Sequence, residues 1–86
     1  MVGENGFFAA LEFPREVLAD VPKITAIGRG AVSVENYQSL LEYEKEIIRL
    51  KIADGVIEIC GDAFEICAIG EGNISISGEI RSIRYV

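Results

Sequence analysis

Short runs of alternating apolar and polar residues occupy the chain from residue 23 to residue 86, and glycines punctuate them. Alternation with a period of two is typical of strands that bury one face. The Asp54-Gly55 dipeptide lies between two such runs, and it is typical of a tight hairpin because glycine tolerates the positive φ of a type I′ turn. The pattern predicts one mainly β domain of about seven short strands, arranged as a meander, roll or sandwich.

Residues 32–52 admit two interpretations. A helix capped by Ser39 would gather apolar side chains on one face, but Glu44 would fall inside that face. A hairpin with arms at residues 40–43 and 46–52 and a turn at Glu44-Lys45 satisfies the alternation in both arms. We favour the hairpin, and a helix over residues 39–48 remains the alternative.

The N-terminal part differs in character from the rest. Residues 1–13 are predicted to be a flexible segment that precedes the domain formed by residues 14–86. Residues 14–20 are predicted to form a short helix, because Pro14 suits a first helical position and Val21-Pro22 disfavours its continuation. The fold prediction is therefore a small β domain with a short N-terminal helix.

A repeated sequence motif suggests an alternative fold for the domain. The motif Ile-x-Ile-x-Gly occurs at residues 57–61 and again at residues 74–78. A short β-solenoid would repeat such a motif on successive rungs, whereas two ordinary strands that end at a turn would repeat it as well. The solenoid is kept as the alternative fold.

Charge and composition exclude several classes of function. The formal net charge is −6 and the chain has no block of basic residues, which disfavours nucleic-acid binding and adsorption to anionic membranes. No apolar run approaches the ~20 residues of a spanning helix, and the short run FFAAL is unlike a signal peptide. We expect no membrane insertion and a cytoplasmic location.

The residue types also limit catalysis and metal binding. The chain has no histidine, which rules out Ser-His-Asp and Cys-His chemistry, and its two cysteines cannot close a zinc site. Cys60 and Cys67 are expected to be reduced. The densest carboxylates have bases interspersed among them and are interpreted as a solvated surface: Glu35, Glu42, Glu44 and Glu46. We expect no catalytic residues, metal or cofactor, and an enzyme or small-ligand binder that uses these carboxylates is the less favoured alternative.

Interaction is the function that the remaining polar residues suggest. Glu35 and Asn36 fit a structural turn, or a contact with a partner. Four bases would form a stripe if the strand around Ile48 lay near the C-terminal strand: Arg49, Lys51, Arg81 and Arg84. Tyr85 belongs to that strand (residues 80–86), which is the first candidate for an uncovered edge. An uncovered edge offers unpaired N–H and C=O groups for β-augmentation or for self-association.

Four ordered segments resemble the YabP/YqfC family of sporulation proteins, the YqfC branch in particular. They are VLADVPKITAIG (17–28), SVENYQSLLEY (33–43), IIRLKIADGVIEICG (47–61) and ISISGEIRSIRY (74–85). Tyr37 departs from the pattern, because members often carry histidine there. The resemblance implies an accessory, non-enzymatic role in the mother cell of a sporulating bacterium, with a protein partner that is sometimes membrane-bound. A structural β-polymer or scaffold is the alternative function.

Overall fold

The structure is a computed structural model that describes residues 21–86, and this part of the chain folds into one antiparallel sheet. The sheet order is β1-β2-β6-β5-β4-β3, and every neighbouring pair is antiparallel. The six strands are β1 (Lys23–Ile27), β2 (Ala31–Glu35), β3 (Ser39–Tyr43), β4 (Ile47–Ile52), β5 (Gly55–Gly70) and β6 (Asn73–Tyr85).

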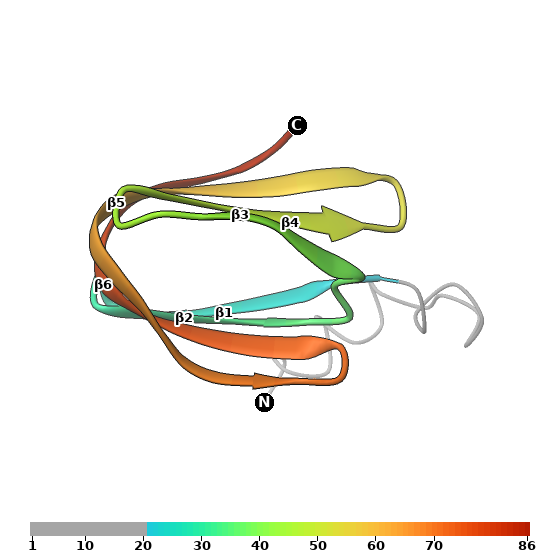
Figure 1. Cartoon of the computed structure of the whole chain (residues 1–86), viewed down its shortest axis with the longest axis horizontal. Helices are drawn as coiled ribbons and strands as arrows, with labels where there is room; N and C mark the ends of the chain where they lie inside the picture. Colours follow the sequence, from blue (N-terminus) through green and yellow to red (C-terminus); the bar gives the residue numbers. More distant parts are fainter. Residues whose placement is uncertain (1–20) are drawn as a thin grey trace, which may run out of the picture.

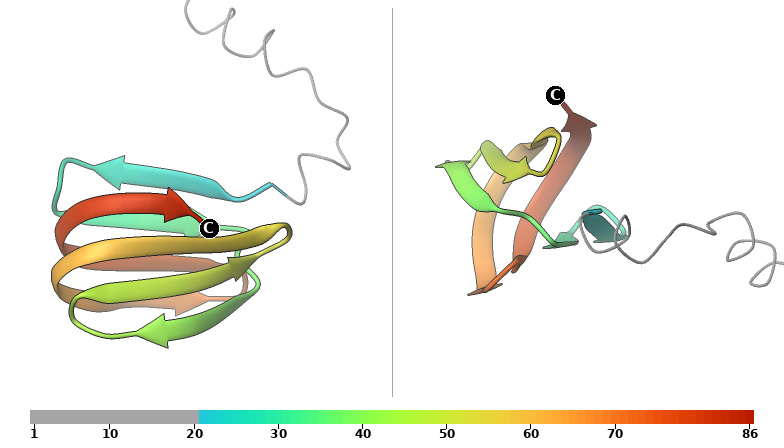
Figure 2. Two further views of the ribbon diagram at one scale, coloured as in Figure 1. Left: turned by 90° about the horizontal axis from the view of Figure 1, so that it is seen from above. Right: turned by 90° about the vertical axis from the view of Figure 1, so that its right-hand side faces the viewer.

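Two long strands fold this sheet over on itself (Figure 1). β5 has 16 residues and β6 has 13, and both curve from one layer into the other. The β3–β4 layer consists of β3, β4, the first half of β5 and the second half of β6. The β1–β2 layer consists of β1, β2, the first half of β6 and the second half of β5 (Figure 2).

Glycines permit the sharp bend where β5 and β6 change layer. A Cβ atom at Gly61 would lie 1.9 Å from the carbonyl oxygen of Glu79 and 2.7 Å from Cζ of Phe64. Gly78 has φ 146°, and a Cβ there would lie 2.7 Å from Cδ1 of the same ring. Register shifts on both sides of Asp62 show local β-bulges, which bend a strand and increase its twist. The two strands therefore bend around the ring of Phe64.

The core lies between the two layers and is almost entirely aliphatic. Its members come from both layers and are at most 2% exposed: Val32, Val34, Ile48, Leu50, Ile52, Ile57, Ile59, Phe64, Ile74 and Ile76. The repeated Ile-x-Ile-x-Gly motif is explained by this arrangement. Each copy supplies two inward-facing isoleucines and then the glycine at which its strand bends. The solenoid alternative is wrong, because its rungs would be parallel and every pair here is antiparallel.

Most of the local predictions agree with this fold. The mainly β class is confirmed, and residues 39–52 form the hairpin β3–β4 rather than a helix. The tight hairpin predicted near Asp54-Gly55 joins β4 to β5, but its turn consists of Ala53 and Asp54, and Gly55 is the first residue of β5, paired with Ile52. The structure describes six strands in residues 21–86 instead of about seven, because β5 and β6 each continue through a bend that the sequence pattern treats as a break. The predicted helix at residues 14–20 and the flexible segment 1–13 lie outside the described residues.

Candidate interaction surface

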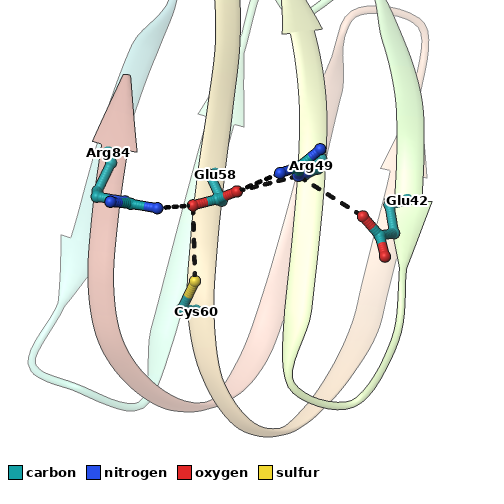
Figure 3. A network of polar contacts seen from close by, with 5 residues as sticks. All are labelled: Glu42, Arg49, Glu58, Cys60 and Arg84. Atoms are coloured by element: carbon teal, nitrogen blue, oxygen red, sulfur yellow. Dashed lines mark hydrogen bonds and ion pairs between the residues drawn. The ribbon is translucent and has the colours of Figure 1, made fainter. Parts of the chain in front are cut away.

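A row of charged side chains crosses the outer face of the β3–β4 layer (Figure 3). Its members, one from each strand, are Glu42 (β3), Arg49 (β4), Glu58 (β5) and Arg84 (β6). The strand register places each directly opposite the next. We call these four residues the charged row. Their charges alternate in sign, and cross-strand pairs of opposite charge stabilise a sheet.

Glu58 is the centre of the charged row. Its Oε2 accepts hydrogen bonds from Arg49 Nε at 3.0 Å and Nη2 at 2.8 Å, and its Oε1 accepts one from Arg84 Nη2. Arg49 Nε also lies 3.6 Å from Glu42 Oε1. The residue Glu58 is only 3% exposed although it lies on the outer face, so its neighbours shield it from solvent. The side chain of Arg84 at the end of the row is 63% exposed.

The two arginines decide the protonation of Glu58. Hydrogen bonds from Arg84 and then from Arg49 lower the pKa of the Glu58 carboxyl below its ordinary value, and together they outweigh burial, which acts in the opposite direction. The hydrogen bond to Glu58 in turn raises the pKa of Arg84. Glu58 is therefore ionised at neutral pH. A general acid needs the opposite shift, so this carboxyl is suited to holding strands together.

The predicted basic stripe has a different geometry from the one expected. β5 separates β4 from β6, and Glu58 stands between Arg49 and Arg84. Arg81 forms an ion pair with Asp62, and Lys51 Nζ donates to its neighbour's carbonyl at 3.4 Å. The structure therefore joins two of the four predicted bases through one carboxylate, and the other two have contacts of their own.

Sequence reasoning missed Glu58. The turn between β4 and β5 consists of Ala53 and Asp54, because Ile52 pairs with Gly55, and this register places Arg49 opposite Glu58. A two-residue turn at Asp54-Gly55, as the dipeptide suggested, would place Arg49 opposite Cys60 instead. The apolar appearance of residues 56–60 concealed the one polar position that faces outward.

One side of the second half of β6 has no strand beside it among residues 21–86. β2 pairs only with Asn73–Ser77, while Gly78 and Ile80 donate to the carbonyls of residues 30 and 29. On the other side, Val56 and Val86 exchange backbone hydrogen bonds of 3.2 and 2.8 Å. Alternation along the ladder then directs the N–H and C=O groups of Ile83 and Tyr85 away from β5. We call this the open side of β6.

The prediction of an uncovered C-terminal edge holds in part. The strand order places β6 inside the sheet, between β2 and β5, so β6 is not an outer strand along its whole length. The corresponding side of β5 is covered, because Phe64 N–H donates to Lys45 O at 3.0 Å and Ile66 N–H donates to the Tyr43 hydroxyl at 3.4 Å. Within the described residues, the open side of β6 has no such cover.

Glu35 and Asn36 lie at the end of β2, in the other layer. Asn36 has φ 68°, and its Nδ2 donates to the carbonyl of Val21 at 2.9 Å while its N–H donates to Gly72 at 2.6 Å. This matches the predicted structural turn. The two residues do not join the charged row, and their contact with a partner stays a prediction.

The other titratable groups do not converge on a site. Glu35, Glu44 and Glu46 are exposed. Within residues 21–86 there is no group of three or more His, Cys, Asp or Glu side chains that could hold a metal ion. Cys60 and Cys67 are free, the former half-buried with its Sγ 4.0 Å from Glu58 Oε1 and the latter exposed. The described residues include no helix that is long and apolar enough to cross a membrane.

The fold defines a small antiparallel β domain in which two bent strands serve both layers. The sequence profile of the YabP family matches residues 19–86, and the chain belongs to that family. It is 39% identical over 77 residues to "Uncharacterized protein YqfC" of Bacillus subtilis (strain 168), an alignment that covers 90% of this chain and 83% of that protein. The resemblance noted in the sequence is thereby confirmed.

Proposed function

We propose that the protein is a non-enzymatic accessory factor of endospore formation, and that it acts in the cytoplasm of the mother cell by binding a protein partner through the open side of β6. The family resemblance supports the sporulation role and suggests a membrane-bound sporulation protein as the partner. The geometry of β6 supports the mode of binding. An extended segment of the partner would add a strand to the β3–β4 layer by β-augmentation.

The observation that carries this proposal is the open side of β6. Ile83 and Tyr85 direct hydrogen-bonding groups away from β5, and residues 21–86 supply them with no paired strand. Apolar side chains are exposed at the same place, because Tyr85 and Val86 are 66% and 68% exposed. A strand that docks here would satisfy the backbone groups and cover apolar surface at the same time.

A proline at position 85 tests the proposal without breaking the native ladder. The N–H of Tyr85 points away from β5, so Tyr85→Pro removes a donor to which residues 21–86 supply no paired strand and which an incoming strand would use. Ser82 is unsuitable, because its backbone faces Cys60 of β5 in the native ladder. The matched control is Tyr85→Val, which also removes the phenol ring but keeps the N–H.

The assay is co-purification of tagged protein from sporulating cells. We expect Tyr85→Pro to lose partners that the wild type and Tyr85→Val retain, while circular dichroism shows that all three remain folded. Equal recovery of the same partners with Tyr85→Pro and with the wild type would refute the proposal.

A further inference from the structure

The β3–β4 layer has two edges, and they carry opposite charges. β3 ends the strand order on one side, and the open side of β6 lies on the other side of the same four strands (Figures 2 and 3). The charged row begins with the carboxylate of Glu42 on β3 and ends with the guanidinium of Arg84 on β6. An acidic residue placed opposite Arg84 would continue the alternation, and Glu42 is such a residue on an outer strand of the same molecule.

Strand direction permits the two edges to meet. The four strands alternate in direction, so β3 and β6 of one chain are antiparallel. A second copy shifted sideways, without being turned over, therefore brings its β3 antiparallel to β6 of the first copy. The outer faces of the two layers then stay on the same side, and Glu42 of the second copy is on the face that carries Arg84.

Backbone hydrogen bonding agrees with the register that pairs these two charges. Glu44 and Ile47 exchange hydrogen bonds of 2.8 and 3.3 Å, so the N–H and C=O groups of Tyr43 point away from β4. When Arg84 stands opposite Glu42 of the second copy, Ile83 stands opposite its Tyr43. Both residues direct their backbone groups into the junction and can form a hydrogen-bonded pair. Arg84 and Glu42 then form a non-hydrogen-bonded pair, the kind of antiparallel pair in which side chains lie closer together.

The same register matches the exposed apolar side chains. Tyr85, which is 66% exposed, stands opposite Leu41 of the second copy, which is 52% exposed. Ile83 stands opposite Tyr43, which is 46% exposed. The β-bulge of β3 between Leu40 and Glu42 ends the regular pairing at Leu41. Cross-strand aromatic and aliphatic pairs of this kind stabilise a sheet.

We infer that the open side of β6 binds strand β3 of a second copy, head to tail, with Arg84 opposite Glu42. The inference rests on the proposed function in that it names an occupant for the same side of β6. Pairing of β6 with another β6 would supply no acid, because residues 81–86 contain none. The other outer strand, β1, carries Lys23 and no acid. A head-to-tail contact repeats, so it builds a ring or an open chain of copies.

Two variants of the full-length chain block one edge each. Glu42→Lys places a base opposite Arg84 of the neighbouring copy and leaves the open side of β6 intact. Tyr85→Pro blocks the open side of β6 and leaves β3 intact. Sedimentation velocity over a range of concentrations is expected to show wild-type assemblies larger than two 9.4 kDa chains. Each variant alone is expected to stay monomeric, with association at least about tenfold weaker than that of the wild type.

An equimolar mixture of the two variants is the decisive sample. It should form a one-to-one dimer, because the intact β6 of Glu42→Lys meets the intact β3 of Tyr85→Pro and no further copy can add. Dimers of Glu42→Lys alone would overturn the inference, since they would show that β6 pairs without β3. A wild type that stays monomeric at the highest concentrations would overturn it as well.

The failure of this inference and the failure of the proposed function give different results. If the wild type is monomeric but Tyr85→Pro loses its cellular partners, the occupant of β6 is another protein and the proposed function stands. If the wild type assembles and the mixture dimerises, but the same cellular partners are recovered with and without the proline, self-assembly stands and the proposed function fails.

Discussion

Phe64 is expected to be the most sensitive single position in the fold. Its ring is 1% exposed and contacts the two bend glycines that let β5 and β6 pass between the layers. Replacement of a buried phenylalanine by alanine costs about 3–5 kcal/mol, because apolar contacts are lost and a cavity remains. A chain of 86 residues has a free energy of unfolding of roughly 4–13 kcal/mol. Phe64→Ala should therefore remove a large part of the total stability.

The assay is thermal and urea unfolding followed by far-UV circular dichroism. At about 4–8 °C per kcal/mol for a domain of this size, Phe64→Ala should lower Tm by roughly 12–40 °C. Phe64→Leu keeps much of the volume and should lose less, which keeps the test informative if the alanine variant fails to fold. Ile69→Ala, on the same strand but 57% exposed, is the matched control and should change Tm by only a few degrees. A Phe64→Ala variant as stable as this control would show that the bend does not depend on the ring.

Three further predictions concern the bend, the charged row and the cysteines. Gly61→Ala should lower the free energy of unfolding by about 1–3 kcal/mol, because the added Cβ would lie 1.9 Å from the carbonyl oxygen of Glu79 and the backbone must shift. An unchanged urea midpoint of unfolding would contradict this close approach of the two strands. The pKa of Glu58 is lower in the folded chain than its ordinary value of 4.5, so the ionised carboxylate stabilises the fold above pH 4.5, and this stability is lost as the pH falls through the folded-state pKa. Acid should therefore lower the Tm of Glu58→Gln less than the Tm of the wild type. Parallel profiles of Tm against pH would refute this. Cys67 is exposed and should react with a thiol reagent in the native state faster than half-buried Cys60, and equal native rates would be inconsistent with the fold.

Local features of the sequence were sufficient for most of the secondary structure. Alternation in residues 40–52 predicted the β3–β4 hairpin, and Asp54-Gly55 predicted the turn into β5, because both signals depend only on near neighbours. The pattern of residues along the chain could not show that β5 and β6 continue through bends at Gly61 and Gly78. There a glycine marks the passage of a strand around Phe64 rather than the end of a strand, and only the packing of distant residues reveals the difference.

The candidate surface was predictable to a lesser degree. The sequence predicts Arg49, Arg84 and Tyr85 as interaction residues. Arg49 and Arg84 belong to the charged row, and Arg84 and Tyr85 lie on the second half of β6. Glu58 was missed because it lies within an apolar run, and its role depends on two arginines that are 9 and 26 residues away in sequence. The pairing of an acidic edge with a basic edge required the strand order, which no local pattern contains.

Disulfide trapping tests the head-to-tail contact most directly. In a chain with Cys60 and Cys67 replaced by serine, one variant carries Ser82→Cys and another carries Glu44→Cys. The proposed register places residue 82 of one copy opposite residue 44 of the next, as a non-hydrogen-bonded pair. The Cα atoms of such a pair are ~4.5 Å apart, which is close enough for a disulfide. The Arg84–Glu42 pair stays intact.

Under mild oxidation, the equimolar mixture should give a disulfide-linked heterodimer that mass spectrometry identifies as residue 82 joined to residue 44. Each variant alone should give little dimer, and a mixture of Ser82→Cys with Thr25→Cys, which places the second thiol at an exposed position on β1, should give no more than that background. Ser82→Cys homodimers as abundant as the mixed product, or no mixed product above the Thr25→Cys control, would contradict the account.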